Sequence, residues 1–206
     1  MVKFQVWAQP WWVNLLVFVP LIVWFLWRRE GLRLSWRQLT ILAAFATAFG
    51  FSEAAVVVYL RAAAGLLPGY AGTLSDVQRA AAISLPAQSV SQLPQSLLTV
   101  EVFREAATLV MLVSVALLSG PRFRERGASF LWVFAIWDIA YYAGLWATVR
   151  WPSSLKDLDV LFLIPVPWIS QVWFPLLVSA LTLLAVALAR TETADAIAVD
   201  TLYSKV

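Results

Sequence analysis

The length of its apolar runs is the feature that most constrains this chain, because several of them approach twenty residues between charged or proline-rich stretches. The hydrocarbon core of a bilayer is about 30 Å thick, and roughly 20 residues of helix are needed to cross it. With 62% hydrophobic and 13% charged residues, the chain has no polar stretch long enough to fold as a separate soluble domain. The sequence therefore predicts an all-α, polytopic integral membrane protein.

Five apolar runs are predicted to be transmembrane helices of a single bundle. The first run contains Pro20, which membrane helices tolerate better than soluble ones do. The apolar segment "DVLFLIPVPWIS" is too short to cross and is interrupted by Pro165 and Pro167, so it is predicted to be a re-entrant or interfacial segment before the last helix. The helices are expected at about 11–27, 38–64, 97–118, 129–149 and 172–189, the bundle at 1–190, an outer loop at 68–95 and a cytoplasmic tail at 191–206.

Arginine is concentrated after the first, third and fifth predicted helices, which five crossings would place on the same side. Short cytoplasmic loops carry the lysine and arginine excess, so we expect the N-terminus outside and the C-terminus in the cytoplasm of a bacterial-type inner membrane. Most of the 12 tryptophans lie near predicted helix ends, which is typical of anchoring at the headgroups, although aromatic walls for a cofactor or lipid are an alternative. The arginines are Arg28, Arg29, Arg33, Arg37, Arg122, Arg124, Arg126 and Arg190.

Several function classes are excluded by what the sequence lacks. Without cysteine or histidine, there is no usual ligand for haem or an iron–sulfur cluster, so no redox cofactor is predicted. The phosphate-binding patterns GxxxxGK[ST] and GxGxxG are absent, so no nucleotide is expected. The arginines are explained by membrane orientation, so no nucleic acid is expected as a partner.

Three predicted helices bring carboxylates to the same layer of the bilayer. With a rise of ~1.5 Å per residue, Glu53 lies about 22 Å from the inner face, and Asp138 about 14 Å. By the same count, Glu101 and Glu105 lie about 6 and 12 Å below the outer face. Acidic residues at such depths are rare in membranes and face a protein interior, a cavity or a partner charge. We therefore expect Glu53 to face the interior and to meet the third helix.

Basic and aromatic residues accompany these carboxylates. Arg104 lies beside the two glutamates of the third helix and is the expected partner of Glu53. Helical spacing puts Glu101, Glu105 and Thr108 on one face of that helix, and groups Asp138 with two tyrosines on the next. The candidate polar cluster comprises Glu53, Arg61, Glu101, Arg104, Glu105, Asp138, Tyr141, Tyr142 and Asp159.

Two interpretations of this cluster compete. It is either a structural network of ion pairs and hydrogen bonds that fixes helix register, with Asp138 bonded to a tyrosine or protonated, or a pocket open to the outside that binds a cation or carries protons. Carboxylate oxygens suit a divalent cation such as Ca²⁺, Mg²⁺ or Mn²⁺. Its ligands would be Glu53, Glu101, Glu105 and Asp138.

These observations lead to one expected function and two alternatives. We expect a small non-redox subunit or accessory protein of a larger membrane complex, with lipid and other membrane subunits, or further copies of itself, as partners. The first alternative is a carrier or receptor for a cation, a proton or a small polar solute. The second is a lipid-active enzyme of the outer leaflet that uses the carboxylates as acid and base. No catalytic motif is present, so an enzyme is not the first expectation.

Overall fold

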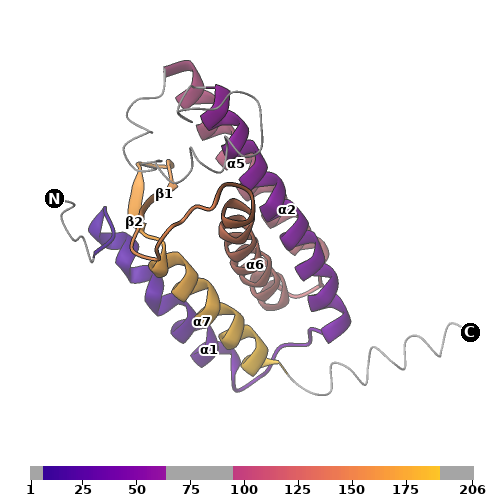
Figure 1. The fold of residues 1–206 in the computed structure, drawn as a ribbon. Helices are drawn as coiled ribbons and strands as arrows, with labels where there is room; N and C mark the ends of the chain where they lie inside the picture. Colours follow the sequence, from indigo (N-terminus) through magenta and orange to yellow (C-terminus); the bar gives the residue numbers. More distant parts are fainter. Residues whose placement is uncertain (1–6, 64–94, 191–206) are drawn as a thin grey trace, which may run out of the picture.

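The structure is a computed structural model that describes residues 7–63 and 95–190, with the backbone alone at residues 60–63. Helices make up most of these residues (Figure 1), so the predicted helical class is confirmed apart from one two-stranded sheet in the described part. The elements in chain order are η1 (Trp11–Phe18), α1 (Val19–Trp27), α2 (Trp36–Ala63), α5 (Gln95–Leu118), α6 (Phe123–Val149), β1 (Leu158–Phe162), β2 (Trp168–Gln171) and α7 (Trp173–Ala189).

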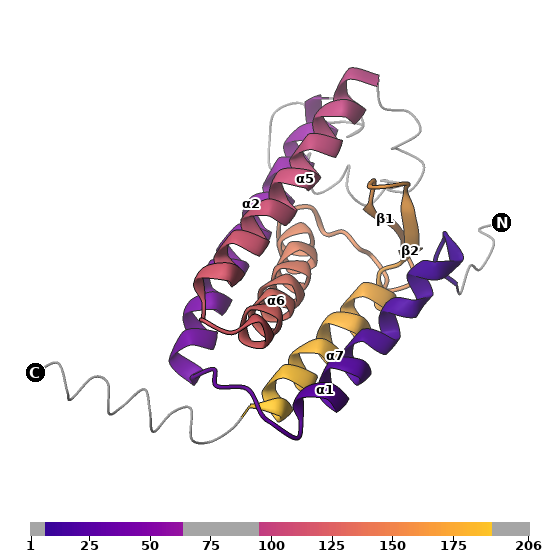
Figure 2. The ribbon, with the colours of Figure 1, turned by 180° about the vertical axis from the view of Figure 1, so that it is seen from behind.

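Helix α6 is the centre of the bundle. It packs most extensively against α2 and also contacts α7 and α5, while α1 packs on α7. Figures 1 and 2 show α2 and α5 on one side of α6, and α7 and α1 on the other. Because α6 has neighbours on both sides, its buried residues include Val133, Trp137, Asp138 and Leu145.

Small residues allow α2 and α6 to cross at close range. A Cβ atom added to Gly50 would lie 2.5 Å from the carbonyl oxygen of Trp137, and one added to Gly144 would lie 3.0 Å from the Cβ atom of Ala54. Neither space admits a side chain without a shift of its neighbours. Since Glu53 follows Gly50 by less than one turn, the crossing brings this carboxylate beside the middle of α6.

The first predicted helix forms over the expected residues but changes its winding. Residues Trp11–Phe18 are a 3₁₀-helix, and the α-helix begins at Val19. Pro20 therefore lies in the first turn of α1, where a backbone N–H would have no partner within the helix. The segment that follows this helix is held against the last residue of α7, because the N–H of Leu32 donates to the carbonyl of Ala189 at 2.8 Å.

The segment expected to be re-entrant or interfacial is an antiparallel hairpin. Its register pairs Leu158 with Gln171, and Asp159 with Ser170. Both prolines, Pro165 and Pro167, lie in the connection between the strands, where a missing N–H breaks no ladder bond. Gln9, which precedes the first helix, pairs with Ile169 of β2 through two backbone hydrogen bonds of 2.8 and 2.7 Å.

The fourth predicted helix begins earlier than expected, at Phe123 rather than near residue 129. Its arginine-rich start was expected to be a loop, but these charges are compatible with a helix because they form local contacts. Arg122 pairs with Glu125 at 3.2 Å, and the side chain of Arg126 donates to the carbonyl of Gly120 at 2.7 Å. The break between α5 and α6 is therefore confined to the short segment around Gly120.

Two of the described helices are long and apolar enough to cross a membrane by length and composition, at Trp36–Tyr59 and Phe123–Val149. The helices Trp11–Trp27 and Trp173–Ala189 are apolar but shorter. Helix α5 carries Glu101, Arg104 and Glu105, so every 18-residue window in it holds three charges. Two of the five expected crossings thus have a helix that is long and apolar enough to cross a membrane. The expected outer loop at 68–95, apart from its last residue, and the tail at 191–206 lie outside the described residues.

The arginine-rich segments meet at the end of the bundle away from the hairpin (Figure 2). Arg124, at the start of α6, forms an ion pair with Glu30, which follows α1. The guanidinium of Arg190, after α7, lies 4.5 Å from the ring centre of Trp36 at the start of α2. The segments after α1 and α7 therefore meet the starts of α2 and α6 at one end of the bundle, which we call the basic end.

Candidate functional site

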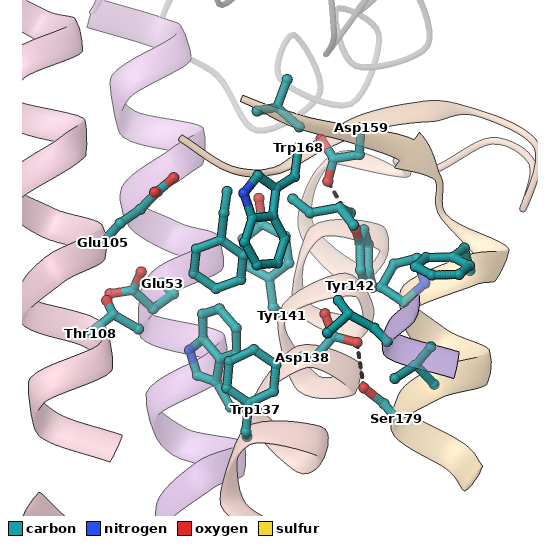
Figure 3. A pocket seen from close by; sticks show the side chains of 18 of the residues that line it. Glu53, Glu105, Thr108, Trp137, Asp138, Tyr141, Tyr142, Asp159, Trp168 and Ser179 are labelled. Carbon is teal, nitrogen blue, oxygen red and sulfur yellow. Dashed lines mark hydrogen bonds between the residues drawn. The ribbon is translucent and has the colours of Figure 1, made fainter. Parts of the chain in front are cut away.

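A cavity of about 100 Å³ lies beneath the hairpin, among α2, α5, α6 and α7. Its lining combines acidic side chains with aromatic rings. In Figure 3, Asp159 and Trp168 lie on the hairpin side, Glu53, Glu105 and Thr108 on the side of α2 and α5, and Asp138 and Ser179 between α6 and α7. The charged residues of the lining are Glu53, Arg104, Glu105, Asp138 and Asp159.

An ion-pair triad links α2 to α5 at one side of this cavity. Arg104 pairs with Glu53 through one terminal nitrogen and with Glu101 through the other, at 2.9 Å in the second case. The expected contact between Glu53 and Arg104 is confirmed. Glu53 and Glu101 are only 5% and 7% exposed, so the guanidinium compensates two carboxylates that are held away from solvent.

Glu105 connects α5 to the hairpin. Its carboxylate accepts a hydrogen bond of 2.8 Å from the backbone N–H of Leu163, in the connection between the strands. The face predicted from helical spacing is present, since Glu101, Glu105 and Thr108 are all buried residues of α5. Helix α5 is thus attached to α2 through the pair of Arg104 and Glu53, and to the hairpin through Glu105.

Two aspartates on the other side of the cavity have hydroxyl partners. Ser179 of α7 donates to Asp138 at 2.8 Å, and the hydroxyl of Tyr142 donates to Asp159 at 3.0 Å (Figure 3). Asp138, expected beside a tyrosine, thus accepts this bond from a serine because its side chain faces α7. Tyr141 lines the cavity as well, and its ring stacks on that of Trp137 with centres 6.1 Å apart.

The carboxylates are divided among three different partners and do not converge on one point. Glu53 and Glu101 meet Arg104, Glu105 meets the hairpin, and Asp138 meets α7. In the part of the chain that the structure describes, no group of three acidic side chains could hold a metal ion. The structure therefore does not bring Glu53, Glu101, Glu105 and Asp138 together as one ligand set, and a divalent-cation site stays a prediction.

Some predicted residues lie elsewhere. Asp157, which lies close to Asp159 in the sequence, does not line the cavity and accepts bonds of 2.8 and 3.1 Å from the backbone N–H groups of Ser153 and Ser154. The side chain of Arg61 lies outside the described residues. The sequence reasoning missed Ser179, whose hydroxyl interrupts an apolar helix and was a usable signal.

Three polar groups in the cavity lining have no hydrogen-bond partner among the described residues. They are the hydroxyl of Thr108 and the indole N–H groups of Trp137 and Trp168, and all three atoms are buried. Buried polar groups are almost always hydrogen-bonded to protein or ordered water. The lining therefore offers unsatisfied donors beside carboxylates that accept.

Comparison with family models, with curated proteins and with solved structures gives no match for this chain. The function must therefore be argued from the residues of the cavity.

Proposed function

We propose that this chain is an integral membrane protein of five crossings that binds a small, uncharged, hydroxyl-bearing group in its acidic cavity. This proposal narrows the expected carrier or receptor of a small polar solute. The observation that carries it is the lining itself, in which the unpartnered donors of Thr108, Trp137 and Trp168 stand beside four carboxylates.

Hydrogen-bonding capacity supports an uncharged, hydroxyl-bearing ligand over an ion. An ammonium group has only donors and would leave the indole N–H groups of Trp137 and Trp168 unpaired. A phosphate has acceptors for them but would face Glu105, Asp138 and Asp159, and like charges repel strongly at low dielectric. A hydroxyl both donates and accepts, so several hydroxyls of one ligand can satisfy both kinds of group.

Helix lengths support five crossings. The first helix has 8 residues in 3₁₀ and 9 in α conformation, which at ~2.0 and ~1.5 Å per residue span about 30 Å. Helix α7, with 17 residues, spans about 26 Å, within the range that bilayers accommodate by local thinning. In α5, Glu101, Arg104 and Glu105 are engaged with α2 and the hairpin, as expected for charges within a membrane.

The distribution of arginine supports the orientation. The basic end of the bundle would face the cytoplasm, so the hairpin and the cavity beneath it would lie toward the outside. A ligand would then reach the cavity from the outer half of the bilayer or from the outer solution.

The expectation of a subunit in a larger complex, with other membrane subunits or a second copy as partners, stays a prediction, and so does that of an outer-leaflet enzyme. Neither is favoured by a specific contact in the described residues. Binding comes first because the cavity supplies a site for it.

The test uses the full chain in phosphatidylcholine nanodiscs and ligand-observed NMR. Three probes are compared: methyl β-glucoside, methylammonium and inorganic phosphate. We expect saturable contact with the glucoside alone. Thr108→Val removes an unpartnered hydroxyl at constant shape and should weaken glucoside binding about tenfold, since one hydrogen bond is worth about 1 kcal/mol or slightly more.

The matched control is Thr99→Val on the same helix, where the hydroxyl is exposed and bonded to the carbonyl of Gln95. It should leave binding unchanged. Binding of methylammonium or phosphate in preference to the glucoside would overturn the proposal, and so would equal effects of the two valine variants.

A further inference from the structure

We propose that the hydroxyl-bearing group is the head of a membrane lipid whose hydrocarbon chain lies in a second cavity beside the first. This inference rests on the proposed function and names the class of ligand. The second cavity, of about 250 Å³, adjoins the acidic one. The two share the lining residues Leu16, Phe134, Phe162, Trp168, Val178 and Ser179.

The second cavity, which we call the chain groove, offers almost nothing to a polar solute. Its two side-chain hydroxyls are already engaged, because Ser179 donates to Asp138 and Thr182 donates to the carbonyl of Val178 at 2.7 Å. An apolar cavity of about 150 Å³ stays dry and takes up a hydrocarbon such as benzene. The larger chain groove is therefore suited to methylene groups.

The walls of the groove come from three sides of the bundle. Leu16 and Val19 of the first helix form one wall, Leu109 of α5 contributes another, and residues of α6 that include Leu131 and Ala135 lie between them. Val19, Leu109 and Leu131 are half-buried rather than enclosed. A hydrocarbon chain can therefore enter from the side of the bundle that faces the bilayer.

Trp168 marks the boundary between the two cavities. Its ring lines both, and its buried N–H has no hydrogen-bond partner among the described residues. In a lipid, the head and the chain are joined by an ester, ether or glycosidic oxygen, which is an acceptor. The unpartnered donor thus lies where the joining oxygen of a lipid would be. A free polyol would satisfy the acidic cavity but would leave the groove without an occupant.

The chain groove cannot by itself give much affinity within a membrane. Lipid tails are as apolar as the groove, so a chain gains little by moving from one to the other. Selectivity would come from hydrogen bonds to the head, and the groove would favour ligands with a chain. The location of the chain is therefore a sharper test than the dependence of affinity on its length.

The experiment is photolabelling of the full chain in phosphatidylcholine vesicles with dodecyl β-glucoside that carries a diazirine at the end of its chain. Labelled residues are identified by mass spectrometry of peptides. We expect labels at Val19, Leu109 and Leu131, reduced about tenfold by excess unlabelled dodecyl glucoside, as for competition at a single saturable site. An octyl probe should label nearer to Leu16, which lines both cavities.

A pair of substitutions on α6 supplies the matched control. Ala135→Leu fills the groove at a residue that is 1% exposed, and it should reduce labelling about tenfold while methyl glucoside still binds. Ala143→Leu makes the same change at an exposed position two turns later and should leave labelling unchanged. If Ala135→Leu does not fold, the positions labelled by the octyl and dodecyl probes in the unaltered chain decide the question.

The outcomes separate this inference from the proposed function. Competed labels at lipid-facing residues, with methyl glucoside still bound, would overturn the lipid inference alone. Absence of competed labels at Val19, Leu109 and Leu131, with methyl glucoside still bound, would show that the hydrocarbon chain does not lie in the groove, and would also overturn the inference. Absence of saturable binding by both glucosides would overturn the proposed function as well.

Discussion

Glu105 of α5 accepts a hydrogen bond from the backbone N–H of Leu163, across 58 positions of sequence. This bond fixes the connection between β1 and β2 over the acidic cavity. The two prolines of the connection supply no N–H of their own, so its contact with Glu105 depends on the backbone N–H groups of Leu163 and Ile164.

Loss of the Glu105 carboxylate should therefore loosen the hairpin locally. Glu105→Ala is expected to raise the amide hydrogen-exchange rate at Leu163 by about 10- to 100-fold, since a hydrogen bond to a charged group is worth ~1.5–3 kcal/mol. The amide of Ile169, which is bonded to Gln9, should keep its rate. Glu105→Gln retains an acceptor and should restore most of the protection, whereas equal acceleration at both amides would contradict a local role.

Two glycine-to-alanine substitutions are expected to have opposite effects, because Gly50 lies at the crossing of α2 and α6 and Gly127 does not. Gly50→Ala places a Cβ 2.5 Å from a backbone oxygen and should destabilise the fold by about 1–3 kcal/mol. At Gly127, the nearest atom would be 3.8 Å away, at the ring of Trp27, so Gly127→Ala should stabilise by up to about 1 kcal/mol through helix propensity. Unfolding in mixed dodecyl sulfate micelles measures both, and a stabilising Gly50→Ala would rule out this close crossing.

The triad around Arg104 predicts a large effect of removing its one cation. Arg104→Met leaves Glu53 and Glu101 buried without compensation and should cost about 3–5 kcal/mol of unfolding free energy. The triple variant Glu53→Gln, Glu101→Gln, Arg104→Met should regain most of that loss. Glu30→Gln, in a pair whose acidic partner is 74% exposed, should change stability by less than about 1 kcal/mol. A small loss in Arg104→Met would mean that solvent reaches the triad.

The proposed orientation predicts which added cysteines react from outside. The chain has no cysteine, so single variants need no background correction. Leu155→Cys, before the hairpin, should react with an impermeant maleimide in intact cells. Phe123→Cys, at the basic end, should react only after permeabilisation. Both positions are exposed, at 56% and 89%, and reaction of both from the same side would contradict a crossing by α6.

The helices were predictable because long apolar runs bounded by charge or proline have few other solutions in a membrane. The hairpin was not, since a short apolar run with two prolines suits several structures and its partners are set by tertiary packing. The pair of Glu53 and Arg104 followed from depth and helix spacing. The bond of Asp138 to Ser179 did not, because it depends on the rotation of α6 against α7.

The crossing of α2 and α6 has a signal in the sequence, in the spacing of small residues. Gly50 and Ala54 are four residues apart, as are Ala140 and Gly144. Such pairs of small residues are typical of close helix contacts in membranes. Both pairs lie at the observed contact between the two helices.

The attachments of the first helix have a consequence for the order in which the protein matures. This helix is made well before its native neighbours, which are α7 and the strand β2 that precedes α7, through the pairings of Gln9 with Ile169 and Leu32 with Ala189. Until the ribosome has delivered those segments, Leu16 has no cavity to line. The proposed binding site would thus be completed only when η1 and α1 dock against α7, a helix that is synthesised more than 140 residues later.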